Sequence, residues 1–592
     1  MKNKHRVIKG ILFFFLWLTA SLNTFSQVVS NNAVLVVPEG AHITVMGDLI
    51  NKTDGDIKLN GVINLKGDWI NHKTNLQLEG EVRFISNPGQ KINGPEITTF
   101  NDVRIIPGSR VVLGDCVTGC KYVTISGTFT NENGADGFTM RPGASLLHQS
   151  ASVAATIERD IAGDEWAWHM LSSPVTAQSI TSGFDDGSFY AWHEPAQTWV
   201  SYTNQSIWPT WDDVNNVGGV TNIFHPYFGY LAAYPFEDGN PQTKVFSGHM
   251  NQGEYSFALQ RLAHPDDQYE GFNMVGNPYP SSIDWKAESG WGGRNNLQTP
   301  DSTISPAGYN MWIWNDDIGN YGAHNSASTS DYAHNGVSRF IPPMQAFWVR
   351  AENHGATLTM NNSIRMHSNQ EWLKSQKDSP GLLQLAISSE ANRYSDEIII
   401  EFGHQNDRGG AEKMFSMYQE APGLYSKKHN ENWSISFLTD INTHPVVPVG
   451  FKAGVKAIYT LSSTGTGFFE QVILEDLHTG TLHDLTQYDS YHFSAGPGDP
   501  QDRFLLHFMT VGTDQQYVAK PIVYHANAML HVVNPWQTKA DIQVYDAGGR
   551  LVQYFKAPTP GMHRFGFQPQ PGIYLIRVLG EKQVIVRKVI IM

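Results

Sequence analysis

Charge, cysteine and long apolar runs are all scarce in this sequence of 592 residues. Charged residues make up 16% and aromatic residues 12% of the chain, and there are 54 glycines. This composition favours turn-rich β structure over helical bundles. The net charge of −15 argues against nucleic acid as a partner, because phosphates bind basic surfaces. It argues against an anionic membrane surface for the same reason.

Familiar catalytic motifs are also missing. The sequence has no Gly-x-Ser-x-Gly nucleophile turn, no His-Glu-x-x-His zinc helix and no phosphate-binding loop. The 23 histidines are scattered rather than spaced as metal ligands. We therefore expect no catalytic residue and no cofactor, and a protein that is not an enzyme.

The N-terminus carries an apolar run with the features of an export signal. Four basic residues within the first nine precede an apolar stretch at residues 11–18, which is too short for a bilayer span of about 20 residues. Small residues then lead to Gln27. This order predicts a signal peptide over residues 1–26. No cysteine stands at the cleavage point and no later stretch is apolar enough to cross a membrane, so we expect neither a lipoprotein anchor nor a transmembrane segment.

Residues 27–160 contain a repeat of about twenty residues. The segment 43–51 (Ile-Thr-Val-Met-Gly-Asp-Leu-Ile-Asn) aligns with 63–71 (Ile-Asn-Leu-Lys-Gly-Asp-Trp-Ile-Asn). Apolar or glycine residues alternate with mostly polar ones over 57–69 and again over 76–84. A strand, a turn and a strand at this spacing predict a β-solenoid, in which neighbouring rungs complete each other's core. A plain antiparallel meander is the alternative. The repeated Gly-Asp and Ile-Asn pairs indicate turns rather than ligands.

The two cysteines of the chain lie close together. Cys116 and Cys120 flank Val-Thr-Gly, and in an exported protein this spacing favours a local disulfide that clamps a loop. A metal site would need further ligands at suitable spacing, and none stands nearby.

Residues 161–370 contain a second, larger duplication, with copies at about 166–260 and 270–367. Segment 168–175 (Trp-His-Met-Leu-Ser-Ser-Pro-Val) matches 272–279 (Phe-Asn-Met-Val-Gly-Asn-Pro-Tyr), and 226–233 matches 343–350. Each copy has the size of a small domain, and tryptophan is concentrated here. The Ser-Ser-Pro and Gly-Asn-Pro-Tyr-Pro signatures resemble those of large surface proteins of the Bacteroidetes, a resemblance that implies location rather than activity.

Residues 380–510 form a third region, in which short apolar runs are separated by Gly, Pro and Asn turns. Strand candidates lie at 382–387, 397–402, 433–437, 456–461, 471–476 and 503–508. This pattern predicts one β-sandwich. Residues 511–524 follow as a linker.

The last region, residues 525–592, reads as a small all-β module. Gly548 and Gly549 permit the positive φ angles of a tight hairpin turn between two apolar runs. Spaced elements of this region are Asn534, Pro535, Asp546, Gly549, Arg550, Gly572, Tyr574 and Lys588.

These elements closely resemble the type A C-terminal sorting domain of the type IX secretion system. The resemblance covers roughly the last seventy residues. It implies a protein of the Bacteroidetes that the secretion machinery carries across the outer membrane. It also implies removal of the module by a sortase-like peptidase, and often attachment of the protein to surface lipopolysaccharide. An ordinary C-terminal β-sandwich is the alternative.

Carboxylates beside tryptophans are the strongest candidates for chemistry. Trp211 precedes Asp212 and Asp213, and Trp314 precedes Asp316 and Asp317. Paired carboxylates serve as acid and base in glycosidases, although neighbours on a strand point to opposite faces. Oxygen-rich turns also suit Ca²⁺, which makes Asp316, Asp317 and Asn320 weak calcium candidates. Solvated turns are the third interpretation.

The tryptophans themselves allow two interpretations. An exposed indole marks a binding surface, which makes Trp211, Trp312 and Trp314 candidates for contact with a glycan or a protein. Tryptophan is nevertheless buried on average, and Trp312 and Trp314 alternate on one strand face, which favours a shared core.

The sequence as a whole predicts an exported, multidomain, all-β protein at the cell surface or secreted. A solenoid-like region precedes a duplicated aromatic-rich module, a β-sandwich and a small sorting domain. We expect a structural or adhesive role, with a surface glycan or matrix as ligand. The alternatives are a secreted carbohydrate-active or other hydrolytic enzyme with its site in the aromatic-rich module, and a scaffold for surface assembly.

Overall fold

The computed structural model describes residues 28–87, 89–114, 122–264, 269–298, 308–330, 332–368, 381–407, 409–509, 521–526, 528–534, 536, 538–557, 561–581 and 584–591. Its regular elements are almost all strands, and α1 (Trp211–Asn215) is the one α-helix among them. The all-β fold class is therefore confirmed. No helix in these residues is long and apolar enough to cross a membrane.

The first region is a parallel β-solenoid, which confirms the repeat and excludes the antiparallel meander. Strands three apart in the chain are neighbours in four parallel sheets, of which the longest runs β1-β4-β7-β10-β13-β16 and ends with β18 beside β16. The strands are β1 (Val29–Asn31), β2 (Val34–Val37), β3 (His42–Val45), β4 (Leu49–Asn51), β5 (Asp56–Leu59), β6 (Val62–Leu65), β7 (Trp69–Asn71), β8 (Leu76–Gln77), β9 (Glu81–Phe84), β10 (Gln90–Asn93), β11 (Thr98–Phe100), β12 (Asp102–Ile105), β13 (Val111–Leu113), β14 (Tyr122–Ile125), β15 (Phe129–Asn131), β16 (Phe138–Met140), β17 (Ser145–Leu147) and β18 (Ala154–Asp160).

The repeated Gly-Asp and Ile-Asn pairs stack one rung on the next. The Asn31 amide donates to Asn51 Oδ1 at 2.9 Å, and the Asn51 amide donates to Asn71 Oδ1 at 3.4 Å and to the turn carbonyl of Gly55. Gly67 leaves room for the rung below, because a Cβ there would lie 2.2 Å from the Gly47 carbonyl carbon. These residues hold the turns together, as the sequence predicted.

The duplicated module follows, and its two copies share one strand order. Copy 1 has a four-stranded sheet in the order β19-β22-β20-β21, and copy 2 has the equivalent order β25-β31-β28-β29. Each copy adds an antiparallel outer pair, β18 with β23 and β24 with β32, so the structure begins each copy earlier than the expected starts at about 166 and 270. Copy 1 comprises β19 (His169–Leu171), β20 (Ser188–His193), β21 (Thr198–Ser201), α1, β22 (Tyr230–Ala233) and β23 (Thr243–His249); copy 2 comprises β24 (Tyr255–Ala258), β25 (Phe272–Gly276), β26 (Ser282–Asp284), β27 (Trp291–Gly292), β28 (Asn310–Asn315), β29 (Asn320–Asn325), β30 (Phe340–Ile341), β31 (Ala346–Arg350), β32 (Thr357–Met360) and β33 (Arg365–Met366).

The two copies also contact each other in a pseudo-symmetric way. The Ser172 N–H donates to the Met344 carbonyl at 3.1 Å, and the matching Gly276 N–H donates to the matching Tyr227 carbonyl at 3.0 Å. In each case the end of the first strand of the four-stranded sheet of one copy (β19 or β25) contacts the segment that leads into the last strand of that sheet in the other copy (β31 or β22). The duplication is therefore visible in strand order and in packing.

The sandwich domain is a single 11-stranded sheet that curls around its own core. Its order is β42-β41-β44-β39-β37-β38-β35-β34-β40-β43, with β36 on β38. The hydroxyl of Tyr491 on β43 donates to Asp476 on β41 at 3.0 Å, which brings the two ends of the sheet together. The strands are β34 (Leu382–Ser389), β35 (Ser395–Phe402), β36 (Gly410–Glu412), β37 (Gly423–Lys428), β38 (Glu431–Leu438), β39 (Val446–Lys452), β40 (Ala457–Thr464), β41 (Gln471–Asp476), β42 (Thr481–Asp484), β43 (Ser490–Ala495) and β44 (Asp502–Met509).

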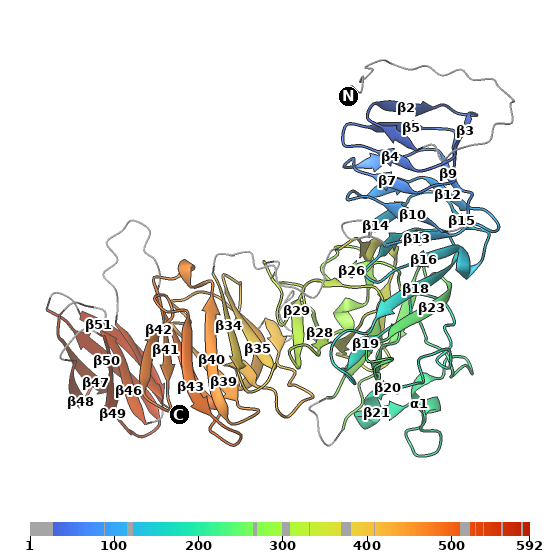
Figure 1. Ribbon diagram of the computed structural model, residues 1–592. Coiled ribbons are helices and arrows are strands. Elements are labelled where there is room, and N and C mark those ends of the chain that lie inside the picture. Colours follow the sequence, from blue (N-terminus) through green and yellow to red (C-terminus); the bar gives the residue numbers. More distant parts are fainter. Residues whose placement is uncertain are drawn as a thin grey trace, which may run out of the picture.

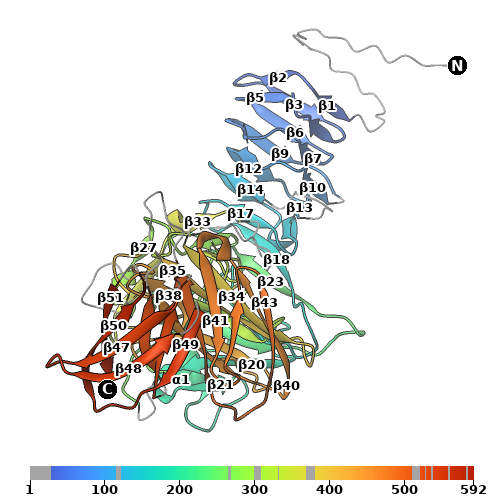
Figure 2. The same cartoon turned by 90° about the vertical axis from the view of Figure 1, so that its left-hand side faces the viewer.

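The terminal module is a small β-sandwich with its own core. Three strands in the order β45-β46-β49 face four in the order β48-β47-β50-β51. They are β45 (Ile522–Ala526), β46 (Met529–Asn534), β47 (Ala540–Asp546), β48 (Leu551–Ala557), β49 (Gly561–Gly566), β50 (Gly572–Leu579) and β51 (Val584–Ile591). Figure 1 shows the solenoid standing on the duplicated module, with the sandwich and the terminal module extending sideways from it. Figure 2 shows the solenoid rungs stacked above the other domains.

Candidate functional site

Asp316, predicted from its place beside Trp314, lies where copy 1, copy 2 and the sandwich meet. It follows β28, and its Oδ1 accepts hydrogen bonds from the Trp168 backbone at 2.9 Å, the Trp314 indole at 3.1 Å and the Tyr418 hydroxyl at 2.6 Å. Its Oδ2 accepts from the Arg393 guanidinium at 2.8 Å. These four donors occupy both oxygens, so the buried carboxylate serves as a structural acceptor.

Arg393 and Tyr418, which both donate to Asp316, have pKa values raised by their surroundings. Burial alone would lower the pKa of Arg393, but the nearby carboxylates of Asp164 and Asp316 outweigh burial and raise it. Burial raises the pKa of Tyr418, and its hydrogen bond to Asp316 raises it further. The arginine therefore stays charged and the tyrosine stays protonated, which are the states that hold the carboxylate in place.

A cleft of about 280 Å³ opens beside this hub. Its walls come from the end of the solenoid, from copy 1 and from copy 2, and they include Glu158, Arg159, Trp168, His169, Asp316 and Asp317. The guanidinium of Arg159 donates to the Met344 carbonyl and to Gln345 Oε1, so it fixes the wall of copy 2. Burial lowers the pKa of His169 to about 4, so the imidazole is neutral at pH 7.

The predicted tryptophans of copy 2 lie in the core. The Trp312 indole donates to the Glu412 carbonyl of the sandwich at 3.0 Å, and Trp314 packs against Tyr321 and Tyr418. Both side chains are buried. They join domains to one another and present no face to a ligand.

The predicted group at α1 is also structural in part. Trp211 is buried and its indole donates to the Thr221 carbonyl at 2.6 Å. Asp213 caps the helix, because its Oδ2 accepts from the backbone and the hydroxyl of Thr210. These hydrogen bonds, the backbone one first, lower the pKa of Asp213. Asp212 is exposed.

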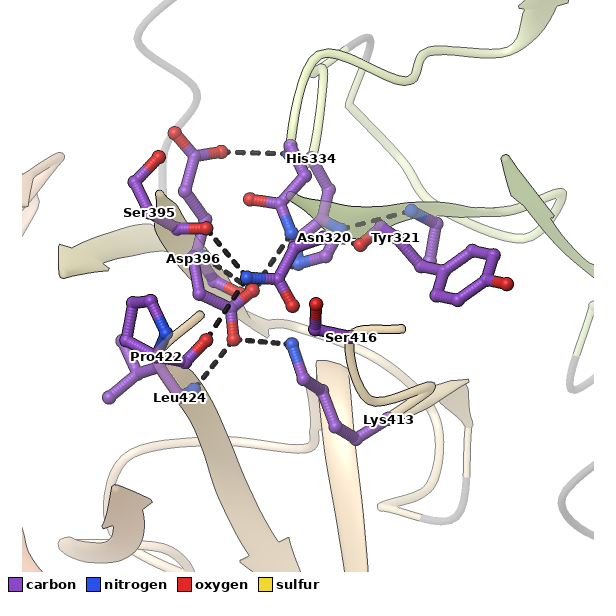
Figure 3. Close-up of polar contacts among 12 residues, drawn as sticks. Asn320, Tyr321, His334, Ser395, Asp396, Lys413, Ser416, Pro422 and Leu424 are labelled. Atoms are coloured by element: carbon purple, nitrogen blue, oxygen red, sulfur yellow. Dashed lines mark hydrogen bonds and ion pairs between the residues drawn. The ribbon is translucent and has the colours of Figure 1, made fainter. Parts of the chain in front are cut away.

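The calcium candidates do not share a site. Figure 3 shows the Asn320 side chain directed at the sandwich, where its amide donates to the Ser395 carbonyl at 2.7 Å and to the Pro422 carbonyl at 3.0 Å. Asp317 faces solvent, and the oxygens of Asp316 are engaged as described. Within the part of the chain that the structure describes, no three His, Cys, Asp or Glu side chains are placed to hold a metal ion. Cys116 and Cys120 lie outside the described residues.

The repeated signatures of the two copies build buried turns. Asn277 of the Gly-Asn-Pro-Tyr segment accepts from the Tyr279 backbone at 3.0 Å and donates to the carbonyls of Ser281, Ile341 and Pro342. The matching Ser173 in copy 1 bonds through its hydroxyl to the backbone of Val175, two residues on. These signatures therefore specify the fold of each copy.

The residues quoted for the sorting resemblance close turns or fill the core of the terminal module. Asp546 accepts from the backbones of Gly548 and Arg550, and Gly549 has a φ of 79°. Asn534 Oδ1 accepts from the Trp536 backbone at 3.1 Å. Buried Tyr574 lies in the core, whereas Lys588 is exposed and Gly572 opens β50. Pro535 lies outside the described residues.

Two ion pairs on buried carboxylates, one inside the sandwich and one between domains, have no signal in the sequence. Asp396 on β35 pairs with Lys413, as Figure 3 shows. Asp396 Oδ1 also accepts a hydrogen bond from the Asn335 amide of copy 2 at 2.8 Å. Glu475 on β41 pairs with Arg564 of the terminal module. Asp396 on β35 and Lys413 after β36 are 17 residues apart, and Glu475 and Arg564 lie in different domains, so no local pattern specifies either pair.

A model of a known family covers most of this assembly. The family is described as "Domain of unknown function (DUF8693)", and its model matches residues 117–508, which is more than half of the chain. The chain belongs to this family. The DUF8693 region runs from the last solenoid rungs through the duplicated module to the end of the sandwich, and thus includes the Asp316 hub and the cleft. The terminal module lies beyond it.

Other comparisons add little. No curated protein matches the chain. One similar solved structure is titled "Biofilm associated protein - BSP domain"; it is 8% identical, with 75% of this chain and 96% of that chain covered and a TM-score of 0.15. A likeness this low supports no argument about fold or function.

Proposed function

We propose that this protein is an exported cell-surface protein of structural or adhesive type, in which the solenoid acts as a spacer or stalk for the DUF8693 region. The observation that carries the proposal is the continuity of the long solenoid sheet with the duplicated module. Strand β18 ends the parallel stack and pairs over its whole length with β23 of copy 1, from Ala154–His249 to Asp160–Thr243. A force applied to the solenoid would thus be transmitted to copy 1 through a hydrogen-bonded sheet, and the sheet would fix the orientation of the two parts.

The contacts between domains support the same role. The Asp316 hub joins both copies to the sandwich through four donors. Asp396 joins copy 2 to the sandwich through Asn335, inside a buried network. Buried polar networks of this kind favour one relative arrangement of the packed domains. A rigid arrangement suits a protein that displays a binding surface.

The terminal module would act as a cleavable C-terminal secretion signal. Its resemblance to the type A sorting domain assigns it to the type IX secretion machinery and to a sortase-like peptidase as partners. Its position beyond residue 508, outside the DUF8693 region, agrees with a part that is removed on export. The protein would then remain on the surface or be released.

Deletion of the terminal module in the native host tests this proposal. We compare the full chain with a chain that ends at residue 520, and measure accessibility to an added protease on intact cells. The full chain should be degraded from outside, whereas the shortened chain should accumulate inside the outer membrane. A shortened chain that reaches the surface as efficiently as the full chain would overturn the assignment of the module.

A further inference from the structure

An exposed apolar loop on copy 1 has no role in the contacts described so far. Residues 204–210 lie in the connection from β21 to α1, and Ile207 and Trp208 in it are 74% and 66% exposed. Single exposed apolar residues are normal on a protein surface. Two large neighbouring ones in one loop call for a physical explanation.

The loop is held rigid from below. The Asn204 amide donates to the carbonyls of Ile207 at 2.8 Å and Pro209 at 2.9 Å, and Asn204 Oδ1 accepts from the Ile207 backbone. The Asn204 carbonyl accepts from the first N–H of α1, at Trp211. The rings of His193 and Trp208 pack edge to face, with the centroids 5.4 Å apart. A preorganised indole loses little conformational entropy when a ligand covers it.

The charge around the loop selects the class of ligand. Residues 160–243, which include the whole of copy 1 up to β23, contain ten Asp and Glu residues and no Lys or Arg. Asp212 is exposed immediately after the loop. Such a surface repels sulfated or uronate polymers, anionic lipids and nucleic acid. It admits cationic and neutral ligands, and the two apolar residues of the loop favour a neutral ligand whose hydroxyl groups can donate to the Asp212 carboxylate.

The equivalent connection of copy 2 shows that this position serves as a contact surface. Between β29 and β31, the Ser328 hydroxyl donates to Glu401 at 3.0 Å, and the His334 ring bonds to the Glu397 carbonyl at 2.7 Å. The sandwich thus covers the connection in copy 2. In the part of the chain that the structure describes, copy 1 has no such cover at residues 204–210, and it carries an exposed indole and an exposed isoleucine there instead.

We propose that this Trp208 loop binds a neutral polysaccharide, with the apolar face of a pyranose ring stacked on the indole. Ile207 extends the apolar contact, and Asp212 accepts hydrogen bonds from ring hydroxyls. The assignment rests on the proposed adhesive function and names its ligand class. It places the binding site on this loop of copy 1, away from the cleft beside Asp316.

Binding of the full chain to insoluble polysaccharides tests the proposal. The probes are microcrystalline cellulose, chitin and insoluble xylan, with polygalacturonate as an anionic control. Trp208→Ala should weaken binding to at least one neutral probe by about fivefold or more, the size of effect typical of a buried anchor residue. Trp166→Ala is the matched control, because Trp166 is also an exposed indole of copy 1, at 48%, and it should change binding by less than about twofold.

Several outcomes would overturn the assignment. Absence of binding to all three neutral probes, or equal binding by wild type and Trp208→Ala, removes the glycan site. Binding to poly-lysine alone, lost at high salt, would make the surface a cationic-peptide site instead. Equal melting temperatures of the variants show that folding is unaffected. A chain that binds but never reaches the cell surface would refute the proposed function, whereas a surface chain that binds nothing would refute only this inference.

Discussion

The adjacent carboxylates Asp316 and Asp317 should respond in opposite ways to the same substitution. Asp316 is buried and accepts four hydrogen bonds from three domains. Asp317 is exposed. Asp316→Asn should therefore destabilise the duplicated module, and Asp317→Asn should be silent.

The magnitude follows from the partners. An asparagine can keep its carbonyl oxygen at Oδ1, where three of the donors meet, but it then turns an NH₂ group toward the Arg393 guanidinium. A hydrogen bond to a charged group contributes about 1.5–3 kcal/mol. The Arg393 side chain is 34% exposed and also pairs with Asp164, so solvent screening reduces the loss to about 2 kcal/mol. For Asp317→Asn we expect less than about 0.5 kcal/mol.

Differential scanning calorimetry measures this difference without assuming that the whole chain unfolds in one step. A loss of about 2 kcal/mol in a unit of this size lowers the melting temperature of its transition by about 4–8 °C. Excess EDTA should leave the wild-type transition in place, because protein donors already occupy the Asp316 oxygens. Equal shifts for the two variants, or an EDTA effect that Asp316→Asn abolishes, would refute the structural role.

Three further predictions concern other buried groups. Burial lowers the pKa of His324 to about 3 and of His334 to about 4. Between pH 6.5 and 4 these histidines bind protons in the unfolded chain but not in the folded one. The free energy of unfolding should therefore fall on acidification, by about 2–3 kcal/mol per histidine near pH 4. A melting temperature unchanged from pH 7 to 4.5 would contradict this. Asp396→Asn leaves the buried ammonium of Lys413 without its counter-charge and should cost about 3–5 kcal/mol in urea unfolding of the sandwich, more than Asp316→Asn. Glu475→Gln removes the counter-charge of Arg564 in the terminal module. Limited proteolysis should then release the terminal module faster, and the melting temperature of the solenoid should not fall.

The solenoid could be predicted because its contacts repeat with the sequence. In a parallel stack each residue meets its own equivalent one rung away, as Ile43 meets Ile63 and Val45 meets Leu65. Local alternation and a spacing of twenty are then sufficient. The helix cap at Asp213 is equally local, since Thr210 and Asp213 stand three residues apart, although we interpreted that carboxylate as a candidate ligand.

The candidate site could not be predicted in the same way, because its partners are distant in sequence. The donors to Asp316 lie 148, 77 and 102 residues away at Trp168, Arg393 and Tyr418. A carboxylate beside a tryptophan gives the same sequence pattern whether its side chain is exposed to solvent or buried where three domains meet. The burial of Trp211, Trp312 and Trp314 likewise depends on neighbours that no local pattern specifies, whereas the exposure of Trp208 follows from a loop that only the fold reveals.

The intact mass of the mature protein from its native host tests the central claim most directly. The account predicts a chain that begins near Gln27 and ends between about Thr510 and His525, with or without an attached glycolipid. A mature chain that still contains Met592 would contradict it, because the terminal module would then be a working part of the protein rather than its export address.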